Sequence, residues 1–338
     1  MKQYHSHQYM AQKIRNTEPL LAFHEEMDYV EWQYEAKNKL EELLGLPFET
    51  CEDRFAITEE KDTEHYHQIG FEFQSEEGYF IPGDFLIPIG ADGKLPVVIG
   101  LQGHSTGKHV SLGVHKFDVD TSDELEHSSF ALQAVQEGYC AVIIDQRYMG
   151  MAGQNVTGHP GCCTTGQALP TLLLGRTAIG ERVWDVMRLI DVLETHFSSY
   201  IDEERIICVG NSGGGTATFY AAALDERIYM AVPSCAVCTF EDSIVDIHHC
   251  SCNYVPGIRK YFNMGDIGCL IAPRRLIVVC GVEDEIFPLQ GVEESYAVIE
   301  MAYQLDGCEK NCRLVKGNGG HQFYPDDVWP IVHELLEE

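Results

Sequence analysis

From residue 96 onward, short and wholly apolar runs alternate with longer segments in which apolar residues recur at helical spacing. Buried strands that alternate with helices are typical of a mostly parallel sheet covered on both faces. The apolar runs lie at residues 96–101, 140–145, 205–210, 229–234, 275–281 and 312–317, and the helical patterns between them lie at 123–138, 181–197, 213–224 and 291–305.

Upstream of these runs the pattern changes twice. Residues 8–45 have the spacing of an amphipathic helix, and Gly45 and Pro47 mark its end. Residues 71–90 alternate apolar and polar positions on either side of a Glu-Glu-Gly turn, which is typical of an antiparallel hairpin. We therefore predict an α/β fold with a central, mostly parallel eight-stranded sheet, an antiparallel edge hairpin and helices on both faces.

The same pattern suggests how the chain is divided. Residues 1–60 are predicted to form an N-terminal helical extension that packs on a catalytic domain, residues 61–338. Two segments within that domain, 149–177 and 235–270, are irregular and interrupt the alternation. Long irregular loops in compact α/β domains usually carry function, so we expect both to act as lids or to line a pocket.

The net charge of the chain argues against some classes of binding partner. Acidic residues outnumber basic ones by 53 to 23, which gives a formal net charge of −30. Such a surface repels phosphate backbones and anionic lipid headgroups. We therefore expect a small-molecule substrate, with neither nucleic acid nor membrane as a partner. A homo-oligomer is compatible with the composition.

The N-terminus has no apolar core or cleavage site of the signal-peptide kind, and nowhere do eighteen apolar residues follow one another. The thirteen cysteines are odd in number, and several stand in apolar runs, as do Cys140, Cys208 and Cys280. Thiols placed like small hydrophobic side chains favour a reduced, cytoplasmic protein.

One hydroxyl group stands where an apolar run passes into a helical pattern. The stretch Gly210-Asn211-Ser212-Gly213-Gly214 fits G-x-S-x-G, the nucleophile elbow, in which glycines two residues on either side of the serine prevent a collision in a strained turn. The helix that follows would direct its first N–H groups at an oxyanion. Ser212 is therefore predicted to be a nucleophile, and a purely structural glycine turn is the alternative.

A serine nucleophile needs a base and a carboxylate that orients it, and this elbow requires them in the order Ser, Asp or Glu, His. Asp284 follows the run 275–281, and His321 follows the run 312–317 on a glycine-rich turn. Both would lie at the ligand-binding edge of an open sheet. Glu285 is the alternative to Asp284, because the acid lies in an acidic stretch.

The second oxyanion donor should come from the loop after an early central strand. Gln102, Gly103 and His104 occupy that place, so the His104 N–H is the predicted donor beside that of Gly213. The His104 side chain is left as either a substrate contact or a packing group. Gln102 and Phe287 are further candidates for substrate binding.

Residues 248–252 combine two histidines with two cysteines. Their spacing matches no usual zinc pattern, although Cys235 and Cys238 are an alternative source of a second half-site. We expect no metal and no cofactor.

Taken together, these residues resemble the α/β-hydrolase superfamily, especially the bacterial group of serine esterases similar to acetyl xylan esterases and dienelactone hydrolase-like proteins. The resemblance runs from about residue 30 to the C-terminus and rests on the stretches LLGLP, LQGHS, GYCAVIIDQR, ERVWDVMRLIDVLE, CVGNSGGG, LIAPRRLIVVCGVEDEIFP and GGHQF. Dienelactone hydrolases proper carry cysteine as nucleophile where this chain has Ser212. Glucuronoyl esterases carry arginine where it has Gly213.

The resemblance implies a cofactor-free serine carboxylic ester hydrolase with a Ser-His-Asp triad, releasing short acyl groups such as acetyl from a sugar or small alcohol. The alternative is a serine peptidase of the prolyl oligopeptidase-like type that acts on small peptides. Those enzymes usually carry a large N-terminal propeller, which the helical N-terminus of this chain cannot form.

Overall fold

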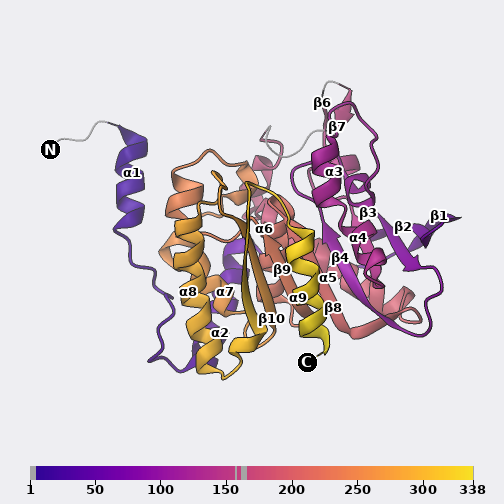
Figure 1. Ribbon diagram of the computed structural model, residues 1–338. Helices are drawn as coiled ribbons and strands as arrows, with labels where there is room; N and C mark the ends of the chain where they lie inside the picture. The colour runs from indigo at the N-terminus through magenta and orange to yellow at the C-terminus, as the bar shows by residue number, and fades with distance from the viewer. Residues whose placement is uncertain (1–4, 157, 161–165, 338) are drawn as a thin grey trace.

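The computed structural model describes residues 5–156, 158–160 and 166–337, which form an α/β structure around one large sheet (Figure 1). The sheet has nine strands in the order β1-β2-β3-β5-β4-β8-β9-β10-β11. The six strands from β5 to β11 in this order pair in parallel, and β1, β2 and β3 join them antiparallel. The predicted class is therefore confirmed, but the sheet is mixed and has one strand more than expected.

The strands of this sheet are β1 (Ala56–Asp62), β2 (Tyr66–Glu76), β3 (Tyr79–Pro88), β4 (Leu95–Leu101), β5 (Cys140–Ile144), β8 (Ile201–Asn211), β9 (Ile228–Ser234), β10 (Arg275–Gly281) and β11 (Cys312–Gly317). The helices are α1 (Ser6–Arg15), α2 (Tyr29–Leu44), α3 (Ser122–Ser128), α4 (Phe130–Gln136), α5 (Ala178–His196), α6 (Gly213–Leu224), α7 (Met264–Cys269), α8 (Leu289–Leu305) and α9 (Pro325–Glu337).

The unexpected strand is β1, at the edge of the sheet beside the predicted hairpin. All seven of its residues are exposed, and the pairing with β2 shifts register between Ile57 and Glu59. A strand without a buried face carries no alternation of apolar and polar residues, so the signal by which strands are recognised is missing here.

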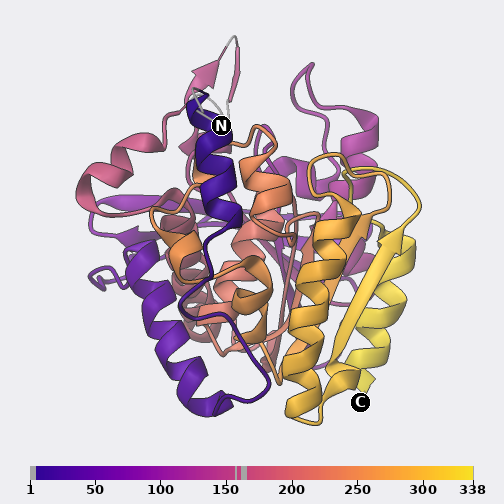
Figure 2. The ribbon, with the colours of Figure 1, turned by 90° about the vertical axis from the view of Figure 1, so that its left-hand side faces the viewer.

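Helices cover both faces of the sheet, as the two buried apolar clusters show. One cluster joins α2, α5, α6, α7 and α8 to one face, and the other joins α4 and α9 to the opposite face. Figure 2 shows α8 and α9 beside the last strands of the sheet. The expectation of helices on both faces is confirmed.

The expected N-terminal helix is divided into two. Helix α1 ends at Arg15, and α2 begins at Tyr29 after Asp28, whose side chain accepts a hydrogen bond from the Glu31 N–H at 3.1 Å. Pro19 lies between them, and proline is incompatible with a helix interior. The predicted end was correct, since Gly45 closes α2 with φ of 79°.

The two helices relate differently to the rest of the molecule. Trp32, Ala36, Leu40 and Leu44 form one buried stripe of α2, which belongs to the main apolar core. Helix α1 instead lies at the periphery, at the left-hand edge of Figure 1 and on the side that faces the viewer in Figure 2. The division into domains at residue 60 stays a prediction.

A second expected helix, 123–138, is also divided, because Ser129 ends α3 and precedes α4 with non-helical backbone angles. The two irregular segments contain little regular structure. The described residues of segment 149–177 carry a short hairpin of β6 (Asn155–Val156) and β7 (His159–Pro160) with 3-10 turns, and segment 235–270 carries short turns and α7. The role of segment 149–177 as a lid or pocket wall stays a prediction. Among the described residues, no helix is both long and apolar enough to cross a membrane.

A buried ion pair ties the loop after β5 to α5. The Arg147 guanidinium donates two hydrogen bonds, each 2.8 Å long, to the two carboxylate oxygens of Asp185. Ser75 on β2 donates a third hydrogen bond to the same carboxylate. The ion pair therefore links a strand, a loop and a helix.

Candidate active site

Ser212 stands in the turn between β8 and α6, as the sequence predicts. Its backbone angles are φ 55° and ψ −121°, and positive φ is rare for a residue other than glycine. Such strain persists only where the surrounding structure enforces it, and it is characteristic of the nucleophile elbow. The Ser212 N–H donates to the carbonyl oxygen of Ser234 on β9 at 2.9 Å, which holds the turn against the sheet.

The neighbouring glycines are required by close backbone contacts. A Cβ atom on Gly210 would lie 2.5 Å from the backbone of Gly214, and one on Gly214 would overlap the carbonyl oxygen of Leu101. These are the two glycines for which the elbow predicts a collision. Asn211 between them is buried, and its side-chain oxygen accepts a hydrogen bond from the Ser234 hydroxyl at 2.9 Å.

Asp284 and His321 lie together beyond the ends of β10 and β11. The Nδ1 atom of His321 is 2.8 Å from Oδ2 of Asp284, and the Asp284 side chain is fully buried. The other carboxylate oxygen accepts the backbone N–H groups of Ile286 at 2.7 Å and Phe287 at 3.1 Å. Glu285, the alternative acid, is exposed.

Opposing effects act on the Asp284 carboxyl. Burial disfavours its charged form, but the hydrogen bond and charge of His321 and the two backbone N–H donors outweigh burial and hold its pKa below the ordinary value of 3.8. The carboxyl is therefore ionised at neutral pH. In that state it accepts a hydrogen bond from Nδ1–H of His321 and leaves Nε2 of a neutral ring as an acceptor.

Ser212 and His321 line the same cavity, which has a volume of about 410 Å³. Gly103 and His104 from the loop after β4 form another wall, and Phe287 a further one. This volume lies within the range of about 300–1,000 Å³ that is usual for small-molecule sites.

The two predicted oxyanion donors stand at this wall. Gly213 is the first residue of α6, and the first N–H groups of a helix have no partner within it. A Cβ atom on Gly103 would lie 3.1 Å from the Asn211 carbonyl oxygen and 3.4 Å from Cβ of Ser212, so the loop that carries His104 approaches the elbow closely. The His104 ring packs on Gly213, where an added Cβ would lie 2.7 Å from its Cε1 atom.

The structure places the two other predicted substrate-binding residues differently. Phe287 lines the cavity but is almost wholly buried, and its ring stacks on that of His321 with the centroids 5.8 Å apart. Gln102 is completely buried and is not among the residues that line the cavity, so the structure places it apart from this site. Gln102 instead accepts a hydrogen bond on its backbone oxygen from the side chain of Gln146 at 2.7 Å.

Several residues of the cavity were not predicted. Asp123, Glu124 and His127 of α3 line it, as do His249 and Asn253. The first three lay within an ordinary amphipathic pattern and gave no chemical signal. The last two belong to the segment 235–270, which was predicted to line a pocket; of these, His249 had been considered only as part of the cluster 248–252.

Cys235 also lies close to the Asp284–His321 pair, because its Sγ atom is within 4.8 Å of their nearest polar atoms. Its backbone has φ of 47°, and its thiol donates to the carbonyl oxygen of Gln322 at 3.3 Å. Burial and the neighbouring carboxylate raise the pKa of this thiol well above its ordinary value. Cys235 is therefore a neutral, buried group beside the pair.

Comparison with family models decides the family. A model described as the Abhydrolase family matches residues 2–314. The chain belongs to the Abhydrolase family. A curated relative, "Putative hydrolase YtaP" of Bacillus subtilis (strain 168), is 28% identical over 250 residues, which are 71% of this chain and 77% of the relative.

Solved structures show the same fold at low sequence identity. A "putative acetyl xylan esterase" of Bacteroides fragilis superposes with a TM-score of 0.83 at 20% identity, covering 99% of this chain and 96% of the other. An acetyl xylan esterase of Paenibacillus sp. R4 gives 0.56 at 19% identity, covering 96% and 98%. A glucuronoyl esterase of Solibacter usitatus gives 0.64 at 14%, covering 90% of each chain. The predicted α/β-hydrolase fold is confirmed.

Proposed function

We propose that this member of the Abhydrolase family is a serine carboxylic ester hydrolase with Ser212 as nucleophile, His321 as general base and Asp284 as the carboxylate that orients the base. The observation that carries the proposal is the 2.8 Å Asp284–His321 pair beside a cavity that Ser212 also lines from a strained elbow. Three groups in these roles are what ester hydrolysis by an acyl-enzyme requires.

In the proposed mechanism, the Ser212 hydroxyl attacks the ester carbonyl while Nε2 of His321 accepts its proton. The N–H groups of Gly213 and His104 stabilise the oxyanion, and each such donor contributes about 3–4 kcal/mol to the transition state. His321 then protonates the leaving alcohol. Water, deprotonated by the same nitrogen, releases the acid from Ser212.

We further propose that the substrate is a carbohydrate ester with a short acyl group such as acetyl. Most of the residues that line the cavity have polar side chains, which can form hydrogen bonds with the hydroxyl groups of a sugar. The acetyl xylan esterases among the solved structures of this fold agree with such a substrate. The polar lining residues include Asp123, Glu124, His127, Ser128, His248, Asn253 and Gln322.

The proposal also accounts for Gly213. An arginine at this position, as in glucuronoyl esterases, would place its Cβ against the His104 ring. A uronate ester would therefore have no arginine partner here, and an uncharged acylated sugar fits better. Hydrolysis of acetylated xylo-oligosaccharides should exceed hydrolysis of methyl glucuronate esters.

The decisive test replaces Ser212 by Ala and measures the hydrolysis of p-nitrophenyl acetate. Loss of the nucleophile of a triad lowers kcat by on the order of 10⁶-fold. Ser199→Ala is the matched control, since this exposed serine lies outside the cavity and its loss should leave activity unchanged. Ser212→Ala protein that is folded, as judged by circular dichroism, and still hydrolyses the ester would refute the assignment. Fluorophosphonate labelling of Ser212 gives an independent readout.

A further inference from the structure

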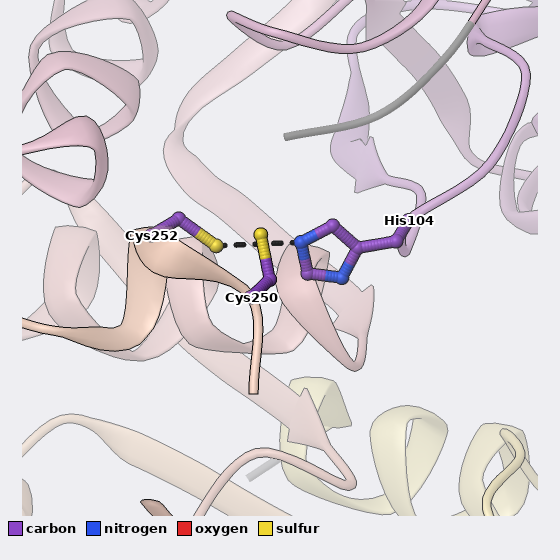
Figure 3. Close-up of side chains that lie close together, drawn as sticks. All are labelled: His104, Cys250 and Cys252. Carbon is purple, nitrogen blue, oxygen red and sulfur yellow. Dashed lines mark hydrogen bonds between the residues drawn. The ribbon is translucent and has the colours of Figure 1, made fainter. Parts of the chain in front are cut away.

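Beside the cavity, which His104 and Cys250 line, three side chains with metal-binding chemistry converge. The Nε2 atom of His104 lies 3.3 Å from Sγ of Cys252, and the donor atoms of His104, Cys250 and Cys252 all lie within 4.8 Å of one another. Figure 3 shows the ring edge of His104 facing both sulfur atoms. His104 and Cys252 are 148 residues apart in the chain and come from two different loops.

The spacing of these atoms fits a tetrahedral ion. With Zn–S bonds of about 2.3 Å and Zn–N bonds of about 2.0–2.1 Å, two tetrahedral ligand atoms are separated by roughly 3.5–3.8 Å. The observed 3.3 Å contact is slightly shorter than this separation, and no pair of the three donor atoms is more than 4.8 Å apart, so all three lie within reach of one ion. Two thiolates and one imidazole are typical ligands of Zn²⁺.

We propose that His104, Cys250 and Cys252 bind one Zn²⁺ ion. Both thiols lose their protons to solvent when the ion binds, and the two thiolates balance its charge. The three ligands leave one position of a tetrahedral ion for a water molecule or a further donor. The sequence pattern did not predict this set, because the fold brings His104, and not Cys235 or Cys238, to the segment 248–252 in the described chain.

The ion would have a positioning role, and this part rests on the proposed function. It would fasten the segment 250–252 of the predicted lid to the loop after β4. The same His104 ring packs on Gly213 at the elbow. Fixing the ring therefore fixes the loop whose His104 N–H is the proposed oxyanion donor. Loss of the ion should lower kcat more than it raises KM.

The test measures metal binding without reference to activity. The full chain is stripped with a chelator under reducing conditions, loaded with Zn²⁺, passed through a desalting column and assayed by mass spectrometry for bound metal. We expect one ion per chain, and Cys252→Ser to weaken binding by more than about 100-fold, since even outer contacts of a metal site contribute about 10–100-fold. Cys308→Ser is the matched control, because this half-buried thiol lies outside the cluster.

Two further measurements use the unmutated chain, so their outcome does not depend on whether Cys252→Ser folds. Co²⁺ added to the stripped chain should give the visible absorption of a tetrahedral site together with thiolate charge-transfer bands. Zn²⁺ should protect Cys250 and Cys252 from alkylation, as mapped by peptide mass spectrometry. Absence of bound metal, of the charge-transfer bands or of this protection would overturn the proposal. If the unmutated chain hydrolyses the ester but takes up no Zn²⁺, the zinc proposal is wrong and the proposed function stands.

Discussion

Replacing Asp284 by Asn tests the proposed triad at the group whose geometry is best defined. One oxygen of the carboxylate accepts two backbone N–H groups, from Ile286 and Phe287, and the other accepts Nδ1–H of His321. In the variant, only the amide oxygen can accept the two backbone donors. The amide NH2 group must therefore face His321 and donate to Nδ1.

This exchange changes the tautomer of the base. An Nδ1 atom that accepts a hydrogen bond leaves the proton of the neutral ring on Nε2, the nitrogen that must take the proton of Ser212. In a triad this substitution preserves the geometry but lowers kcat by about 10⁴-fold. The loss corresponds to about 5.4 kcal/mol of activation free energy. We expect a loss of this order at neutral pH, with KM little changed.

The assay is steady-state hydrolysis of p-nitrophenyl acetate by purified protein. Glu283→Gln and Glu285→Gln are matched controls, because they make the same chemical change at exposed acids on either side. Both should keep wild-type kcat. If Asp284→Asn were folded and retained kcat within ten-fold of the wild type, the orienting role of Asp284 would be wrong.

The same variant should also change how the free energy of unfolding depends on pH. Since the folded pKa of Asp284 lies below its ordinary 3.8, the carboxylate adds stability that is present above about pH 4 and is lost as pH falls through the lowered value. The difference in unfolding free energy between wild type and Asp284→Asn should therefore be constant at neutral pH and shrink in acid. Urea unfolding at several pH values measures it, and a difference that grows in acid would contradict the cause assigned to the shift.

Three further predictions concern the framework. Gly214→Ala should prevent the elbow from forming, because the added methyl group would overlap the carbonyl oxygen of Leu101, and a thermal melt within 2 °C or so of the wild type would contradict this. Asp185→Asn should lower the free energy of unfolding by about 1.5–3 kcal/mol, because Arg147 loses its paired hydrogen bonds to a buried carboxylate although its ion pairs with Glu76 and Glu181 remain. A loss below about 1 kcal/mol in urea titration would show that the Asp185 pair is not needed. Trp32→Ala should cost about 3–5 kcal/mol by the same measurement, since this ring anchors α2 in the core, and a cost typical of a surface site would mean that α2 is dispensable.

The sequence predicted most of the fold because buried elements carry strong patterns. All six central strands and the hairpin of β2 and β3 were located, since each has a buried face or is buried on both faces. The features that the sequence did not predict lie where few side chains are buried or where a helix is interrupted. Strand β1 has no buried residue, and the breaks at Ser129 and between α1 and α2 depend on local polar residues that a periodic pattern does not resolve.

For the candidate site, the sequence predicted which residues stand in the order that the elbow requires. It did not predict which loops the fold brings together around them. It predicted Ser212, Asp284 and His321 because an elbow and two strand ends have recognisable local patterns. The contacts of His104 with Cys252 and of α3 with the cavity depend on loops distant in the chain. The resemblance to dienelactone hydrolase-like proteins stays a prediction.

The exposed edge strand β1 also bears on self-association. An unpaired strand edge offers a row of backbone groups to which another chain can add a strand. This edge carries Glu59, Glu60, Lys61 and Asp62 in succession, and its register shift bends it away from regular pairing. Charges and a bulge are among the devices by which proteins protect such edges. Extension of the sheet from one molecule into the next is therefore disfavoured on this side.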